Sequence, residues 1–157
     1  MILIAGASGF VGRALLDALA GRGGEPVRAL VRREFDAVRL RNRGVEAMVG
    51  NLTAGAGLDT AMRGVKTFVY LAHTPDLPGD PVANELTAAQ NATLAARSAG
   101  VQRVVHLGPI AASEVATARY LVARWAVELA VRQSGMTSVV LRAPIIVGTG
   151  GTLFEMM

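Results

Sequence analysis

Short runs of β-branched and aliphatic residues alternate along the chain with longer stretches rich in Ala and Leu. Each short run has the length of a buried strand, and each longer stretch has room for a helix. This alternation is typical of repeated β-α units, which build a parallel sheet. Strands are predicted at residues 2–5, 27–31, 45–49, 67–71, 103–107 and 138–141.

The longer stretches carry apolar residues at helical spacing. In the first, apolar side chains recur at intervals of three and four from Val11 to Leu19, and the glycine run at 21–24 is suited to end a helix. This helix is expected to begin near Gly9. The other helices are predicted at about residues 36–42, 58–62, 82–99 and 119–133.

Six strands joined by helices predict an α/β fold, a three-layer doubly wound parallel sheet of the Rossmann type with strand order 3-2-1-4-5-6. No internal repeat, low-complexity tract or linker divides the chain, so residues 1–157 are expected to form a single domain. In such a sheet a ligand binds at the carboxyl ends of the strands, where the order switches between strands 1 and 4. Functional residues are therefore expected just after the strands.

The composition excludes several classes of site. Hydrophobic residues make up 52% of the chain and charged residues 18%, which suits a sheet buried on both faces. There is no cysteine, and no group of His, Asp and Glu has metal-ligand spacing, so neither disulfides nor a metal are expected. No apolar run approaches the roughly 20 residues of a membrane span, and Met1 leads straight into a strand without room for a signal peptide. The protein is therefore expected in the cytoplasm, with no membrane partner.

The net charge of +4 raises the question of nucleic-acid binding. Lys66 is the one lysine, and the arginines are spread along the chain with a concentration between Arg28 and Arg43. Aromatic residues make up only 4%, which leaves few rings to stack on bases. The favoured interpretation is a solvated arginine-rich surface, and no nucleic-acid partner is expected.

A glycine-rich segment follows the first strand and opens the first helix. Gly6 allows a sharp turn, Gly9 leaves room for a pyrophosphate, and Gly12 lets the helix pack closely on the sheet. The helix N-terminus offers unpaired N–H groups and a partial positive charge to phosphates. The segment predicts a dinucleotide site formed by Gly6, Ser8, Gly9, Phe10, Val11 and Gly12.

The residues after the second strand bear on the choice of cofactor. A site for NAD usually carries an acid here, which binds the adenosine ribose. This chain has Arg32 and Arg33 instead, and a guanidinium suits the 2′-phosphate of NADP, with Arg32 the better candidate. NADP is therefore the predicted cofactor. NAD remains the alternative, with Glu34 as a displaced ribose acid.

The last predicted helix carries Tyr120 and Arg124 one turn apart on the same face. A cation beside a tyrosine stabilises its phenolate and lowers the pKa of the phenol, so that it can pass a proton during hydride transfer.

Two histidines and a tryptophan have plainer interpretations. His73 is expected to line the nicotinamide side of the site, His106 to lie in the core, and Trp125 to pack on its helix.

Together these motifs resemble the extended and atypical branches of the short-chain dehydrogenase/reductase superfamily, along the whole chain. Residues 50–52 resemble its Gly-Asp-Leu, residues 68–73 its fourth strand, and residues 99–107 its fifth strand with the Ala-Gly-Val before it. Residues 120–128 are similar to its Tyr-x-x-x-Lys-x-x-x-Glu helix. The last residues are most similar to an uncharacterised bacterial branch described as NAD(P)-binding. The resemblance adds as cofactor contacts Asn51, Leu52, Leu71, Ala72, His73 and Pro144.

Three departures from the family pattern affect the expected chemistry. Gly108 and Pro109 stand where the family has its catalytic serine or threonine, and Arg124 stands where it has lysine. The sequence stops just after the sixth strand, so the C-terminal portion that closes over the substrate in relatives is expected to be largely absent. The substrate therefore cannot be named from this sequence.

The resemblance implies an NAD(P)-dependent oxidoreductase for an unidentified small molecule, with Tyr120 as proton donor and Arg124 as its electrostatic partner. Gly108 favours the alternative of a non-catalytic dinucleotide-binding sensor or regulator, as in the family's nitrogen-regulator relatives. A third hypothesis is a structural subunit that needs no cofactor. The apolar residues 153–157 would form its interface, and they also suggest a homodimer.

Overall fold

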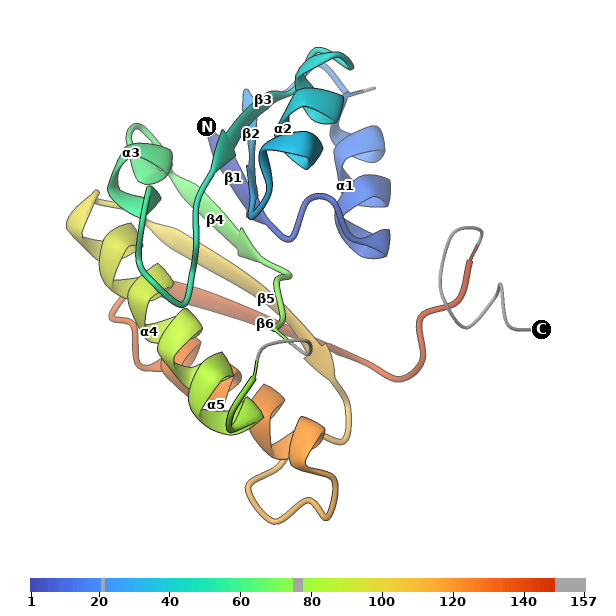
Figure 1. Cartoon of the computed structure of the whole chain (residues 1–157), viewed down its shortest axis with the longest axis vertical. Coiled ribbons are helices and arrows are strands. Elements are labelled where there is room, and N and C mark those ends of the chain that lie inside the picture. Colours follow the sequence, from blue (N-terminus) through green and yellow to red (C-terminus); the bar gives the residue numbers. More distant parts are fainter. Residues whose placement is uncertain (21, 75–77, 149–157) are drawn as a thin grey trace.

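The computed structural model describes residues 1–20, 22–74 and 78–148, and contains one six-stranded sheet (Figure 1). All neighbouring strands pair in parallel, in the order β3-β2-β1-β4-β5-β6. The predicted doubly wound topology is thus confirmed. The strands are β1 (Ile2–Ala5), β2 (Val27–Val31), β3 (Glu46–Val49), β4 (Thr67–Tyr70), β5 (Arg103–Pro109) and β6 (Thr137–Ala143). The helices are α1 (Phe10–Ala20), α2 (Glu34–Arg41), α3 (Leu58–Met62), α4 (Pro81–Ser98) and α5 (Arg119–Arg132).

Helices cover the sheet in two layers (Figure 1). The helices α1 and α2 pack on one face, where Leu16 and Leu40 contact the inner strands. The helices α3, α4 and α5 pack on the other face, around Phe68 and Val104. The buried face of α4 is built mainly from alanines. These small side chains allow the helix to lie close to both the sheet and α5.

The register of the three central strands determines where the functional residues meet. Ala5 of β1 lies beside Leu30 of β2 and Tyr70 of β4. The segments that follow these strands therefore begin at the same edge of the sheet, at the switch between β1 and β4. This edge is where the sequence predicts the cofactor.

Both β5 and β6 extend further at their carboxyl ends than predicted. Gly108 pairs with Arg142 and Pro109 with Ala143, and the N–H of Ile110 donates to the carbonyl of Ala143. Pairing between neighbouring strands overrides the low strand propensity of glycine and proline here. As a result, Gly108 lies within the sheet and faces α4 and α5, like His106 two residues before it.

The helix α4 begins at a well-defined cap. The side chain of Asp80 accepts a hydrogen bond from the N–H of Val82, and Pro81 occupies the first helical position. Asp80 also forms an ion pair with Arg119, which lies at the start of α5. The N-termini of the two helices are thereby tied together.

Two features of the sequence interpretation concern residues outside those described. The first feature is the glycine run expected to end α1, whose first residue, Gly21, is not described. The second is the apolar segment 153–157, which suggests a homodimer and also lies outside the described residues. Within the described ranges, no helix is long and apolar enough to cross a membrane.

Candidate cofactor site

A cleft of about 520 Å³ opens at the carboxyl ends of the central strands. Its walls come from the segments that follow β1, β2, β3 and β4. Among its lining residues are thirteen of the predicted cofactor contacts: Gly6, Ser8, Gly9, Phe10, Val11, Gly12, Arg32, Arg33, Asn51, Leu52, Leu71, Ala72 and His73. Pro144 lies exposed just after β6, outside this lining, and neither Tyr120 nor Arg124 is part of it.

The glycine loop has room for backbone only. Gly6 has a φ of 87°, and a Cβ there would lie 2.8 Å from the backbone nitrogen of Ala72. A Cβ on Gly12 would lie 2.2 Å from the carbonyl oxygen of Gly6. Gly12 therefore lets the start of α1 lie against the backbone of Gly6 and Ala7, directly after β1. Any side chain at Gly6 or Gly12 would push the loop out of shape.

The start of α1 presents free donors to the cleft. The first hydrogen bond of helical type runs from the N–H of Arg13 to the carbonyl of Gly9, at 2.9 Å. Among the described backbone hydrogen bonds, none uses the N–H groups of Phe10, Val11 or Gly12. Unpaired N–H groups at a helix N-terminus form an anion site, so the loop fits a pyrophosphate.

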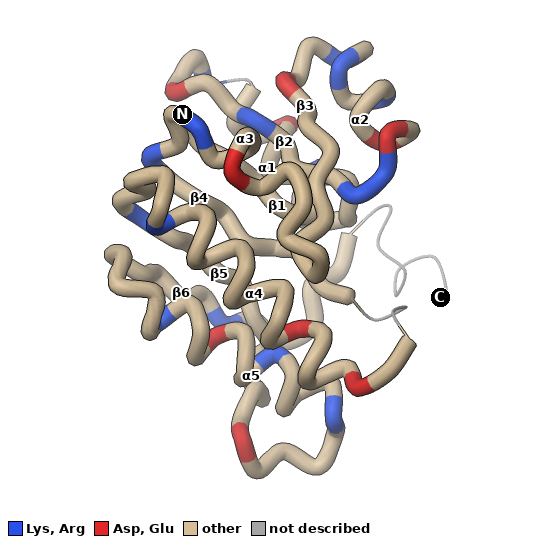
Figure 2. Tube along the Cα trace, turned by 60° about the vertical axis from the view of Figure 1, so that its left-hand side comes forward, with Lys and Arg blue, Asp and Glu red and all other residues tan. Residues whose placement is uncertain are grey.

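Two arginines after β2 reach the cleft, but their surroundings differ. Arg33 donates through Nε to Oδ2 of Asp36 at 2.9 Å. Arg32 is exposed and makes no hydrogen bond or ion pair within the described part of the chain. The charge of Arg32 is therefore available to a phosphate, while the charge of Arg33 is already balanced by Asp36. Figure 2 shows the basic positions gathered on α2 and on the connection from β2.

Asp36 is a cleft residue that sequence reasoning missed. It lies in the first turn of α2, is buried and lines the cleft. Glu34, the acid considered from the sequence, points elsewhere and pairs with Arg41 at 2.6 Å. Because α2 begins at Glu34 rather than at residue 36, Asp36 faces inward. The sequence gave no signal of whether Glu34 or Asp36 would face the site, because this helix has little amphipathic pattern.

The loop after β3 is held by two asparagines. The side-chain oxygen of Asn51 accepts from the N–H groups of Thr53 and Ala54, which closes a turn. Asn91 on α4 donates to the carbonyls of Leu52 and Thr53, each at 2.9 Å. The long helix thus positions this wall of the cleft.

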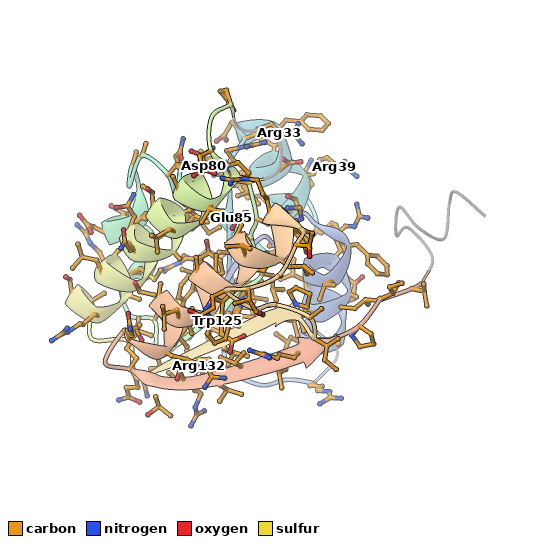
Figure 3. The ribbon with its side chains drawn as sticks, turned by 90° about the horizontal axis from the view of Figure 1, so that it is seen from below. Arg33, Arg39, Asp80, Glu85, Trp125 and Arg132 are labelled. Atoms are coloured by element: carbon orange, nitrogen blue, oxygen red, sulfur yellow. The ribbon has the colours of Figure 1, made fainter. Side chains whose placement is uncertain are left out.

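The wall after β4 is held from behind by a buried ion pair. Arg124 on α5 is 4% exposed, and its Nη1 lies 3.1 Å from Oε2 of Glu85 on α4. Figure 3 shows Glu85 between the two helices. The same nitrogen donates to the carbonyl of Ala72 at 3.2 Å, and Oε1 of Glu85 accepts from the N–H of Thr74 at 2.5 Å. Both Ala72 and Thr74 line the cleft on their other side.

Tyr120 and Arg124 differ in their exposure to solvent. Tyr120 lies in the first turn of α5 and is 56% exposed, whereas Arg124 is buried. No hydrogen bond joins the two side chains in the described part of the chain, because the guanidinium is turned toward Glu85 and the strand ends.

Two more polar side chains lie buried under the same strand ends. Nδ1 of His106 lies 3.1 Å from the carbonyl oxygen of Tyr70, so it carries the proton, and Nε2 is left as an acceptor. Burial, together with the charge of Arg124, lowers the pKa of His106 to about 4. Burial also raises the pKa of Tyr70 well above its usual value.

Within the described residues, neither the hydroxyl of Tyr70 nor Nε2 of His106 has a hydrogen-bond partner. Gly108 lies directly beside this histidine, because a Cβ there would lie only 3.2 Å from Nε2. A serine at this position, as in the short-chain dehydrogenase/reductase pattern, would bring its hydroxyl close to His106. His106 is fully buried, as expected, and Trp125 is half-buried on its helix with the guanidinium of Arg142 over its ring.

A family model described as NAD(P)H-binding matches residues 6–156, almost the whole chain. The chain belongs to this family. The match begins at Gly6, the first residue of the loop that fits a pyrophosphate. The resemblance noted in the sequence is confirmed at this level.

Among curated proteins, the chain is similar to several reductases. It is 35% identical to the ceramide reductase of Caulobacter vibrioides over 155 residues, which is 97% of this chain and 48% of that protein. It is 36% identical to a (4-alkanoyl-5-oxo-2,5-dihydrofuran-3-yl)methyl phosphate reductase of Streptomyces griseus, over 87% of this chain and 44% of that protein. The chain therefore spans about half the length of these relatives.

Solved structures share the fold. The triphenylmethane reductase of Citrobacter sp. complexed with NADP(H) matches with a TM-score of 0.77 and 25% identity, over 92% of this chain and 50% of that one. A short-chain dehydrogenase/reductase superfamily protein from Agrobacterium tumefaciens with bound NAD matches with a TM-score of 0.74 and 26% identity, over 90% and 48%. Both cofactors thus occur among proteins of this shape.

Proposed function

We propose that the chain binds NADPH in the cleft at the ends of β1, β2 and β4, as the cofactor-binding part of a reductase for a small molecule. The observation that carries the proposal is the combination of unpaired N–H groups at the start of α1 with a free guanidinium, that of Arg32, at the end of β2. The reductase names of the relatives from Caulobacter and Streptomyces support the reaction type. When bound, the nicotinamide would supply a hydride to the substrate.

The preference for NADPH over NADH rests on the balance of charge at the adenosine end. Arg32 is free to form a charge-assisted, bidentate contact with a 2′-phosphate. Asp36 favours ribose hydroxyls instead, but Arg33 already engages its carboxylate. The complex of the Citrobacter reductase with NADP(H) supports the same preference.

Calorimetric titration with NADPH and with NADH tests the cofactor assignment. We expect tighter binding of NADPH, and a loss of about tenfold to a hundredfold in NADPH affinity in Arg32→Ala, the range of one hydrogen bond to a charged group. NADH affinity should change little. Arg103→Ala is the matched control, because Arg103 is an exposed arginine at the opposite end of the sheet. Failure of the wild-type chain to bind either dinucleotide would contradict the proposal.

Tyr120 is the proposed proton donor of the reaction, with Arg124 contributing its charge from one turn along α5. Support comes from the half-exposed phenol in the first turn of α5 and from the buried cation four residues further along the same helix. The variant Tyr120→Phe should bind NADPH like the wild type and lose turnover of any substrate found. Full turnover in this variant would remove Tyr120 from the mechanism.

The second candidate function is a dinucleotide-binding sensor, which Gly108 favours because it places no hydroxyl beside the substrate. Tight NADPH binding without oxidation of NADPH by a broad panel of carbonyl and quinone substrates would favour the sensor.

The reductase proposal also implies a cytoplasmic location and a small-molecule substrate. A homodimer is proposed only as an assembly to be measured, by sedimentation of the purified chain.

A further inference from the structure

The buried pair Glu85–Arg124 makes contacts that a pair serving only to join two helices would not need. Besides their mutual contact, Arg124 donates to the carbonyl of Ala72 at 3.2 Å and to that of Leu107 at 3.5 Å. Glu85 accepts from the N–H of Thr74 at 2.5 Å and from its hydroxyl at 3.3 Å. Each of these further contacts reaches the chain at the carboxyl ends of β4 and β5.

Other interactions already hold α4 and α5 in place. Asp80 and Arg119 tie the two N-termini, and the alanines of α4 and valines of α5 pack in the common core. Acidic and basic positions lie next to each other where the two helices meet (Figure 2). The pair of Glu85 and Arg124 must overcome a large desolvation cost, which makes it a poor device for stability alone. What it adds is a specific position for the segment 72–74.

Residues 72–74 form the wall of only one half of the cleft. The pyrophosphate is expected at the loop between β1 and α1, and the adenosine toward β2 and β3, where Arg32 and Asn51 lie. The other half of a dinucleotide must then extend over the end of β4, against Leu71, Ala72 and Thr74. Within the described residues, no hydrogen bond of Glu85 or Arg124 reaches the adenosine half.

We infer that Glu85 and Arg124 are positioning residues for the nicotinamide half of the cofactor, acting through the backbone of residues 72–74. This rests on the proposed binding of NADPH and assigns to Arg124 a task that does not depend on Tyr120. Loss of the pair frees the wall after β4 while the glycine loop and the adenosine end keep their shape. The effect on binding is therefore confined to ligands that carry a nicotinamide.

The test compares two ligands, NADPH and 2′,5′-ADP, which has the adenosine half and the 2′-phosphate but no nicotinamide. In Glu85→Gln and Arg124→Gln we expect NADPH affinity to fall roughly tenfold, about the worth of one fixed hydrogen bond, and 2′,5′-ADP affinity to stay within twofold. The enhancement of NADPH fluorescence on binding should fall as well, because the nicotinamide loses its fixed surroundings.

A double variant guards against loss of folding. Glu85→Leu combined with Arg124→Met removes both buried charges together, which is often neutral for stability, but it cannot restore the hydrogen bonds to residues 72–74. It should keep the thermal stability of the wild type and still lose NADPH affinity selectively. The matched control is Arg142→Gln. It breaks an ion pair between β6 and the buried Glu128, which lies on α5 like Arg124 but outside the lining of the cleft. It should leave the ratio of the two affinities unchanged.

The outcomes separate the inference from the proposed function. Equal losses for both ligands, or no loss for either in the folded double variant, overturn the positioning role and leave the cofactor assignment intact. The same holds if the wild-type chain binds NADPH no more tightly than 2′,5′-ADP, because the nicotinamide then makes no contact with the wall. If the wild-type chain binds neither ligand, the proposed function fails, and the inference fails with it.

Discussion

The two halves of the cleft are built on different principles. The half formed after β1 and β2 uses backbone groups and exposed charges: the loop from Gly6 to Gly12 and the guanidinium of Arg32. The half formed after β4 rests on buried polar side chains, Glu85 and Arg124, which approach from two helices. The first half needs the correct backbone conformation of one loop and the close approach of Ala72 to Gly6. The second needs several distant elements to be in place at once, so the two halves should respond differently to substitution.

The largest effect is expected where a side chain is added to the backbone-built half. Gly12→Ala places a Cβ 2.2 Å from the carbonyl oxygen of Gly6, so either the loop or α1 must move. We expect NADPH binding to weaken by about a hundredfold or more, and the free energy of unfolding to fall by about 3 kcal/mol. Calorimetry and chemical denaturation measure the two effects.

Gly24→Ala is the control for this substitution, because a Cβ on Gly24 meets nothing within 4 Å. Its stability and NADPH affinity should match those of the wild type. A Gly12→Ala variant that binds NADPH normally would show that the loop tolerates a side chain, and the backbone-built half would lose its distinguishing feature.

Acid should destabilise the fold through His106, which lies buried under the strand ends of the polar half. The pKa of His106 is about 4 in the folded protein and about 6.5 when unfolded, because burial disfavours the imidazolium. Between these values the unfolded chain binds more protons, so the free energy of unfolding falls as the pH is lowered from about 6.5 to about 4. The total loss is about 3 kcal/mol.

Denaturant titrations across this pH range measure the loss, and His106→Gln should flatten the curve between pH 6.5 and 4. Glu128 does not produce the same slope. Burial alone would raise its pKa, but hydrogen bonds from Arg142 and Arg132 outweigh burial and lower it, so its contribution is lost only below its usual range. A slope that persists unchanged in His106→Gln would contradict the assignment.

A smaller effect is expected from the acid at the adenosine end. Asp36→Asn removes a carboxylate from the cleft wall and frees the guanidinium of Arg33. We expect NADPH affinity to rise by about threefold to tenfold and NADH affinity to fall, because one cation is gained for the 2′-phosphate and one acceptor is lost for the ribose. The ratio of the two dissociation constants is the measurement, and an unchanged ratio would place Asp36 outside the recognition of the ribose.

The smallest effect is expected at the acid that the sequence suggested. Glu34→Gln breaks only an exposed pair with Arg41. The free energy of unfolding should change by less than about 0.5 kcal/mol, and NADH affinity should not change. A marked loss of NADH affinity in this variant would restore Glu34 as the ribose acid in place of Asp36.

The sequence predicted much of the fold and most of the cleft lining. The strand order, the glycine loop and the arginines after β2 follow from patterns of neighbouring residues. The ends of β5 and β6 were less predictable, because pairing with a neighbouring strand decides them. The start of α2 was also less predictable, because Arg33, whose carbonyl accepts the first helical hydrogen bonds, has no side-chain cap that would mark it in the sequence. One consequence was that Asp36, rather than Glu34, faces the cleft.

What the sequence alone determined is local: hydrophobic periodicity, the need for glycine where no Cβ fits, and the charge that follows a strand. What only the tertiary structure decided is which distant groups meet. The partner of Arg124 is Glu85, 39 residues away, rather than Tyr120 one turn before it. The physical reason is desolvation, since a guanidinium buried by the packing of α5 on the sheet must find a carboxylate and carbonyls inside the same core. Those groups come together only when α4, β4 and β5 have folded around it.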